Sequence, residues 1–292
     1  MNTKRQSIIL LLFISGWLLS ACGQRQSPSP VFTPTATSAP TPTSLPTATP
    51  APNNPAPAIT MNCDDQALIN SGVFRAENNT WGKGTLTGWS QCIGLDVGAD
   101  GTLMGRWTWN WPGSGDNVKA YPEIIFGQKP GSVSTTADLP RKISSLNEVI
   151  IDYDVASTHT GSGNIAFDIW LTDIQNPSTW GVPPITQEIM IWLDYFGGMR
   201  PGGTRIEQAT IDGIPYNIYV GENFGQGWRY IAFVRAKTQL GSGTLNLVSF
   251  LAYIQAKGLA TGDEYVASIE FGTEVVSGVG ETILKKYRIS VR

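Results

Sequence analysis

The stretch QEIMIWLDY, residues 187–195, alternates like a β-strand and carries an acid near its start. Successive side chains of a strand point to opposite faces of its sheet. Ile189 and Leu193 therefore share an aliphatic face, which can join a hydrophobic core. The other face holds Glu188 and Trp192, which a core does not require. The stretch thus predicts a sheet with one core face and one surface that needs a functional explanation.

The same alternation recurs in other parts of the chain. In NIAFDIWL (164–171) the aliphatic face lies opposite Asp168 and Trp170, and SIEFGTE (268–274) sets its glutamates opposite its apolar side chains. In RWTWNW (106–111) three tryptophans share one side. Several strands are therefore expected to carry carboxylates or indoles on the face opposite their aliphatic one.

A sheet face with both groups is typical of a carbohydrate groove. Sugar rings present flat C–H patches that stack on aromatic rings, and their hydroxyls need acidic and amide partners. Two carboxylates placed across a glycosidic bond can also cleave it. The alternation alone is equally compatible with core tryptophans and solvated strand acids, so both interpretations stay open at this point.

The region 61–292 has the pattern of one all-β domain. Glycine accounts for 32 and tryptophan for 10 of the 292 residues, which fits many short strands joined by tight turns. One segment, LNLVSFLAYIQAKG (245–258), has helical periodicity with Gly258 as terminator. Strands with one apolar and one polar face predict two sheets packed as a sandwich, with one face exposed.

Charge and cysteine content narrow the class of protein. The net charge of −3 lacks the excess of positive charge that is typical of nucleic-acid-binding proteins. Cys63 and Cys92 form an even pair, for which a disulfide is the simplest interpretation in a secreted chain, although free thiols or a partial metal site remain open. The single histidine, His159, gives no zinc-type cluster, and we expect neither metal nor cofactor.

The first residues resemble an export signal. A basic start precedes an apolar run of about fourteen residues, too short to span a bilayer. Leu19-Ser20-Ala21-Cys22 resembles the lipobox of bacterial lipoproteins, so residues 1–22 predict a signal peptide and a lipidated Cys22 on the outer side of the membrane. The alternative is a plain secretory signal with an incidental cysteine.

Residues 23–60 are rich in proline, threonine and serine, and from Gln26 to Asn62 no residue is charged. Such a composition predicts a disordered, extended spacer. It would serve as a tether through a cell wall or surface layer, or as a linker that merely separates the signal from the fold.

Seven short motifs follow in order along the domain: ENNTWG (77–82), Gln91-Cys92, DNVKAYPEI (116–124), NIAFDIWL (164–171), QEIMIWL (187–193), IPYNIYVG (214–221) and FGTE (271–274). Together they resemble glycoside hydrolase family 12. Val275-Val276 departs from the Pro-Phe that often follows the family's GTE motif, and Ile214-Pro215-Tyr216 stands where a tryptophan is common. Neither departure touches the two motif glutamates.

The resemblance implies a β-jelly roll that cleaves β-1,4-glucans within the chain and retains anomeric configuration. It assigns Glu188 as nucleophile, ionised in the free enzyme, and Glu274 as acid/base, protonated at rest. Asp168 is expected beside Glu188 and hydrogen-bonded to it. Trp81 resembles the family's stacking residue, and further substrate contacts are expected from Asn79, Trp192, Trp109 and Met190.

Two other classes of protein remain as alternatives. A surface lipoprotein that only binds glycans would need the groove but not both glutamates, and a structural surface protein would need neither. The hydrolase interpretation predicts a monomer whose partners are a β-glucan and, through Cys22, the membrane, with no nucleic-acid ligand.

Overall fold

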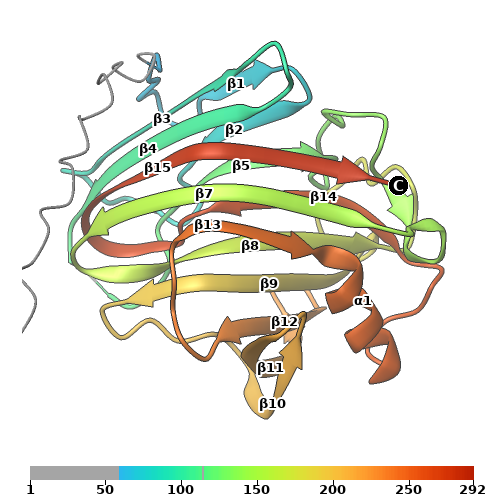
Figure 1. The fold of residues 1–292 in the computed structure, drawn as a ribbon. Coiled ribbons are helices and arrows are strands. Elements are labelled where there is room, and N and C mark those ends of the chain that lie inside the picture. Colours follow the sequence, from blue (N-terminus) through green and yellow to red (C-terminus); the bar gives the residue numbers. More distant parts are fainter. Residues whose placement is uncertain (1–58, 114) are drawn as a thin grey trace, which may run out of the picture. The chain divides into compact units, whose positions relative to one another are not determined.

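The computed structural model describes residues 59–113 and 115–292, which fold mainly into strands (Figure 1). The predicted signal with Cys22, and the predicted linker up to residue 58, lie outside the described residues. No helix in the described part of the chain is long and apolar enough to cross a membrane.

Nine strands form one sheet in the spatial order β1-β2-β5-β14-β8-β9-β12-β11-β10, and β6 pairs with β14. Within it, β12 runs parallel to β9. Its strands are β1 (Leu68–Ser71), β2 (Phe74–Asn79), β5 (Tyr121–Gly127), β6 (Arg141–Lys142), β8 (Ser162–Thr172), β9 (Ile185–Phe196), β10 (Thr204–Ile211), β11 (Ile214–Phe224), β12 (Trp228–Arg235) and β14 (Tyr265–Gly272).

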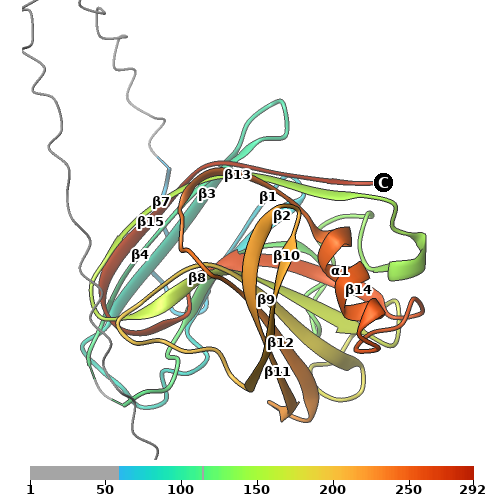
Figure 2. The same cartoon turned by 60° about the horizontal axis from the view of Figure 1, so that its bottom comes forward.

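A five-stranded layer packs over this sheet in the order β3-β4-β15-β7-β13 (Figure 2). Its strands are β3 (Ser90–Val97), β4 (Leu103–Trp111), β7 (Val149–His159), β13 (Gly241–Asn246) and β15 (Val275–Val291). The first residues of β15 also pair with β8, so this long strand connects the two layers. The predicted all-β sandwich is confirmed.

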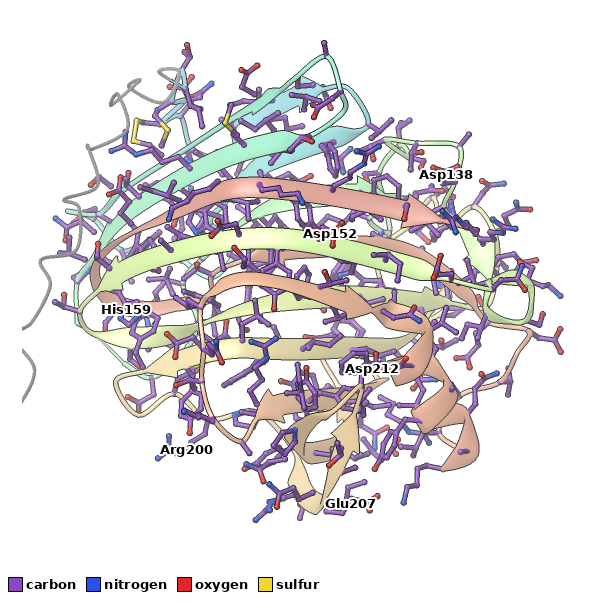
Figure 3. All side chains as sticks on the ribbon, viewed as in Figure 1. Asp138, Asp152, His159, Arg200, Glu207 and Asp212 are labelled. Carbon is purple, nitrogen blue, oxygen red and sulfur yellow. A yellow bond between two sulfur atoms is a disulfide. The ribbon has the colours of Figure 1, made fainter. Side chains whose placement is uncertain are left out.

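The core lies between the layers. The aliphatic faces of β8 and β9 are fully buried there, as the alternation predicts. Trp107 of β4 meets Phe271 of β14 edge-on at 6.0 Å, which ties the layers together. Figure 3 shows side chains filling this space, while charged residues such as Arg200 and Glu207 lie toward the outside.

The three tryptophans of β4 belong to this core. Trp107, Trp109 and Trp111 are at most 2% exposed and point inward from the five-stranded layer. Trp109 packs against Phe196 at 6.5 Å. The predicted substrate contact of Trp109 is therefore wrong, because the alternate face of β4, which includes Arg106 and Asn110, is polar, and the indole face is the one that meets the other sheet.

The predicted helix is confirmed as α1 (Leu247–Ala256). The Asn246 side chain accepts a hydrogen bond from the Val248 backbone N–H at 3.2 Å and caps its start. Its buried stripe, which includes Phe250, packs edge-on against Tyr216 and Phe233. Gly258, with a φ of +68°, follows its end in the left-handed conformation that glycine tolerates best.

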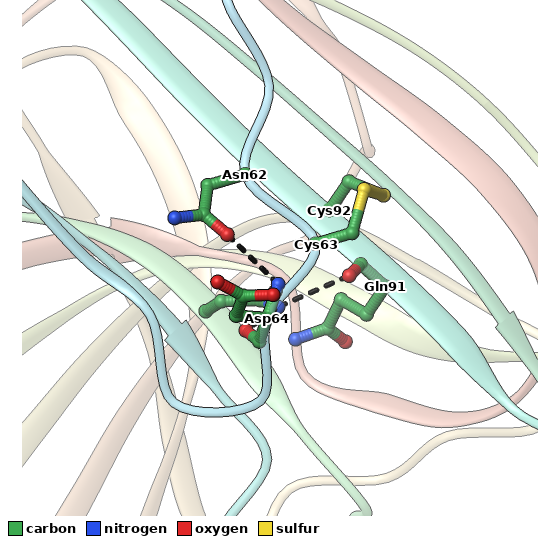
Figure 4. The surroundings of a disulfide bond; sticks show 6 residues. Asn62, Cys63, Asp64, Gln91 and Cys92 are labelled. Atoms are coloured by element: carbon green, nitrogen blue, oxygen red, sulfur yellow. Dashed lines mark hydrogen bonds between the residues drawn. A yellow bond between two sulfur atoms is a disulfide. The ribbon is translucent and has the colours of Figure 1, made fainter.

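The predicted disulfide is present between Cys63 and Cys92 (Figure 4). It attaches the segment before β1 to β3, beside the backbone hydrogen bonds that pair Asn62 with Ile93. The linked segment precedes β2, which ends next to the cleft described below.

Candidate active site

A cleft of about 1010 Å³ opens on the face of the nine-stranded sheet turned away from the core. The strand faces with acids and indoles meet there, as the alternation predicts. Asp168 and Trp170 come from β8, Glu188 and Trp192 from β9, and Glu274 from the turn between β14 and β15. Since neighbouring strands place their side chains side by side, the cleft floor is continuous across the sheet.

Glu188 is partly buried near the start of β9 and lines the cleft. Its Oε2 accepts a hydrogen bond from Trp228 Nε1 at 2.7 Å. Burial raises the pKa of Glu188 to about 8, and the negative charge of Glu274 adds to the rise, while the Trp228 hydrogen bond opposes it. Trp228 carries no signal in the sequence motifs and was not predicted.

Glu274 is fixed by Asn164, which faces it from the start of β8. The Asn164 side-chain amide donates to Glu274 Oε2, and the Glu274 backbone N–H donates to Asn164 Oδ1 at 3.2 Å. The Asn164 backbone N–H donates to the Glu274 carbonyl at 3.0 Å. Burial raises the pKa of Glu274 to about 7, against the lowering effect of the Asn164 hydrogen bond.

These pKa values do not separate in the order that the resemblance implies, with Glu188 ionised and Glu274 protonated. Both carboxyls are raised because both are shielded from water, and Glu188 also feels the charge of Glu274. Protons in such an interacting pair belong to the pair as a whole. At neutral pH the cleft therefore retains protons that exposed glutamates would have lost.

Asp168 lies between these strands with only 6% of its surface exposed, and its Oδ1 has no hydrogen-bond partner among the described residues. Burial raises its pKa well above the ordinary value, and the charge of Glu188 raises it further. The structure has no hydrogen bond between Asp168 and Glu188, although one was expected. The charge of Glu188 instead acts on Asp168 by raising its pKa.

Asp168 and Glu188 belong to a larger set, here called the carboxyl row, which crosses five neighbouring strands: Glu77 (β2), Glu123 (β5), Glu270 (β14), Asp168 (β8) and Glu188 (β9). Glu77 pairs in register with Glu123, and Glu270 with Asp168. The other steps are diagonal, two residues off register. Each strand thus contributes one acid to a line along the cleft floor.

One lysine holds the far end of the carboxyl row. Lys129 Nζ lies 2.5 Å from Glu123, 2.8 Å from Glu77 and 3.9 Å from Glu270. Burial raises the pKa of Glu123 well above its usual range, although the charge of Lys129 lowers it. The sequence motifs assign no role to Glu77, Glu123, Glu270 or Lys129, because their proximity depends on pairing between distant strands.

The predicted substrate contacts other than Trp109 all line the cleft. Trp81 is 65% exposed at its rim. Asn79 donates a hydrogen bond to Glu123 at 2.8 Å. Trp192 and Met190 are 1% and 2% exposed and form floor, with Trp192 Nε1 3.4 Å from Met190 Sδ. In residues 59–113 and 115–292, no His, Cys, Asp and Glu side chains group in a way that could hold a metal ion.

Comparison with known proteins agrees with this geometry. Endoglucanase S of Pectobacterium parmentieri is 31% identical over 242 residues, which cover 80% of this chain and 88% of that protein. A probable xyloglucan-specific endo-beta-1,4-glucanase A of Aspergillus terreus is 30% identical over 238 residues, 78% of this chain and 86% of that one.

Solved structures show the same jelly-roll fold. The family 12 xyloglucanase from Bacillus licheniformis superimposes with a TM-score of 0.71 at 28% identity, over 80% of this chain and 100% of that one. Endoglucanase cel12A from Rhodothermus marinus superimposes with a TM-score of 0.68 at 27% identity, over 80% of this chain and 99% of that one. The model of glycosyl hydrolase family 12 matches residues 72–292, and the chain belongs to that family.

Proposed function

We propose that this chain hydrolyses internal β-1,4-glucosidic bonds of a β-glucan with retention of configuration. The observation that supports it most is that Glu188 and Glu274, which are far apart in the sequence, line one cleft on the same face of the sheet. A retaining mechanism needs two carboxyl groups on either side of the scissile bond. The relatives named above are endoglucanases and xyloglucan-specific enzymes, which agrees with a glucan substrate.

In the first step Glu188 attacks the anomeric carbon, and Glu274 gives its proton to the departing glycosidic oxygen. This forms a glycosyl ester on Glu188 and breaks the glucosidic bond. In the second step Glu274 takes a proton from water, the water oxygen attacks the anomeric carbon, and Glu188 leaves as carboxylate. The loss of charge on Glu188 in the ester lowers the pKa of Glu274, which favours its change from acid to base.

Trp228 and Asp168 act on Glu188 in opposite directions. The indole N–H stabilises the ionised form that attacks, whereas a charged Asp168 would repel it. Burial, and then the charge of Glu188, raise the pKa of Asp168, which favours a protonated Asp168 and so removes this repulsion. The Trp228 hydrogen bond opposes the rise that burial causes in the pKa of Glu188.

Release of reducing sugar from carboxymethylcellulose, barley β-glucan and xyloglucan tests the proposal. We expect release from at least one, with an early fall in viscosity that marks cleavage inside the chain, and a product that initially has the β-anomeric configuration by NMR. Tight binding without release from any of them would instead favour a glycan-binding surface protein.

The same proposal places the enzyme outside the cell as a monomer, tethered through Cys22 by the segment 23–60. The lipobox-like Leu19-Ser20-Ala21-Cys22 supports this. Fractionation of cells that express the full chain tests it. Activity should sediment with membranes and move to the medium in Cys22→Ser, and activity found in the medium for both chains would reject the anchor.

A further inference from the structure

Three tryptophans that line the cleft meet beside Glu188, and this group is here called the tryptophan corner. Trp170 lies in β8, Trp180 in the connection from β8 to β9, and Trp228 at the start of β12. The ring of Trp170 is 4.8 Å from Trp180 and 5.2 Å from Trp228, and Trp180 is 5.8 Å from Trp228. The ring planes cross at 70° to 89°, so each ring packs edge-on against the others.

The members of the corner differ in exposure. Trp170 and Trp228 are 4% and 7% exposed, whereas Trp180 is 42% exposed and lines the cleft. Trp180 packs against two buried rings, and its backbone lies close to Gly131, where an added Cβ would come within 3.3 Å of the Trp180 nitrogen. An exposed indole that is fixed in this way offers a preformed flat apolar surface.

The corner also contains an unused hydrogen-bond donor. Trp170 Nε1 is buried and has no hydrogen-bond partner in the described part of the chain. This N–H has almost no accessible surface, so the indole of Trp180, and not the Trp170 donor, is the group that the corner offers to a ligand. A fixed, exposed indole in the wall of a cleft is the flat apolar surface on which a sugar ring stacks.

The position of the corner links it to the candidate nucleophile and separates it from Trp81. Trp228 donates its hydrogen bond to Glu188. Trp81 lies before β5, where the Gly82 N–H donates to the Lys119 carbonyl, whereas Trp180 lies next to the segment after β5. A strand of seven residues spans about 20 Å. The two exposed tryptophans thus lie at opposite ends of β5.

We propose that the tryptophan corner is a sugar-binding subsite, in which Trp180, held by the buried rings of Trp170 and Trp228, stacks on one pyranose ring of the glucan chain. The subsite lies beside Glu188, and Trp81, near the other end of β5, contacts a different sugar of the same chain. This inference rests on the proposed function, and it adds Trp180 to Trp81 as a second aromatic residue that positions the substrate.

End-labelled β-1,4-gluco-oligosaccharides test the subsite, because they report where the chain lies in the cleft. Trp180→Ala should shift cleavage toward one end of the oligosaccharide, and Trp81→Ala toward the other. Trp180→Ala should also lower kcat/KM on hexasaccharides roughly ten-fold, through KM, which corresponds to about 1.4 kcal/mol. Trp180→Phe keeps an aromatic surface and should recover most of the loss.

Two results would overturn the subsite. One is an unchanged cleavage pattern in Trp180→Ala; the other is a fall in kcat at unchanged KM for every oligosaccharide length, which would mean that Trp180 only supports Trp228. If the unaltered chain cleaves nothing, the proposed function fails and calorimetry decides the subsite separately. In that case, cellohexaose binding that is weakened in Trp180→Ala supports the corner, and equal or absent binding rejects it.

Discussion

Trp228 Nε1 donates a 2.7 Å hydrogen bond to Glu188 Oε2 across two neighbouring strands, β12 and β9. It is the hydrogen bond that lowers the pKa of Glu188 against the effects of burial and of Glu274. A hydrogen bond to a charged group in such a place contributes about 1.5–3 kcal/mol. The protonation of the candidate nucleophile therefore depends on a residue outside the sequence motifs.

Trp228→Phe should shift the pH profile of the enzyme. Without the indole N–H, the ionised form of Glu188 is less stable and its pKa rises, so a higher pH is needed to form the nucleophile. Taking ~1.5 kcal/mol for the lost bond, the acidic limb of kcat/KM should move up by about one pH unit. Trp89→Phe is the matched control, since Trp89 stacks on Trp111 at 4.6 Å outside the cleft. An acidic limb that stays in place would show that Trp228 does not tune Glu188.

Alanine at each glutamate should give a different response to azide. Glu188→Ala removes the nucleophile and should abolish turnover, and added azide should attack from the vacated face to give a product of inverted configuration. Glu274→Ala should give a product of retained configuration with azide, because Glu188 still forms the ester. NMR of the two products measures this. An inverted product from Glu274→Ala would mean that the two roles are exchanged.

Removal of both cysteines, Cys63→Ala with Cys92→Ala, should lower stability with little change in activity. The bond closes a loop with a sequence separation of 29 residues, for which chain entropy predicts about 3–4 kcal/mol. Neither cysteine lines the cleft. Urea denaturation followed by tryptophan fluorescence measures the free energy of unfolding, and an unchanged value would show that the bond does not constrain the unfolded chain.

The strands β8, β9 and β14 could be predicted because alternation is a local property of the sequence. β5 was not proposed from its own pattern, because all seven residues of YPEIIFG are buried and show no alternation. β2, FRAENN, is polar enough to resemble a loop. Both strands lie inside the nine-stranded sheet, where neighbours on each side satisfy the backbone.

The face that an alternating strand turns to the core was harder to predict. In β9 the aliphatic face is inward and Trp192 lies on the cleft face, whereas in β4 the tryptophan face is inward because the alternate residues, such as Arg106 and Asn110, are polar. A tryptophan on an alternating strand therefore belongs to the core or to the cleft depending on what the opposite face carries. The carboxyl row also escaped prediction, since Glu77, Glu123 and Glu270 become neighbours only through the order β2-β5-β14, which joins segments far apart in the sequence.

Lys129→Met should destabilise the enzyme, and more so at higher pH. In the folded protein Glu123 already has a raised pKa, and loss of Lys129 raises it further, so the folded state binds more protons than the unfolded state above the ordinary glutamate pKa of about 4.3. Stability is then lost as the pH rises from 5 to 8. Breaking such a buried pair costs ~3–5 kcal/mol, whereas Lys142→Met, which breaks an exposed pair with Asp263, should cost little. Thermal unfolding across this pH range measures both, and an equal loss of Tm at pH 5 and pH 8 in Lys129→Met would show that the lysine does not neutralise the carboxyl row.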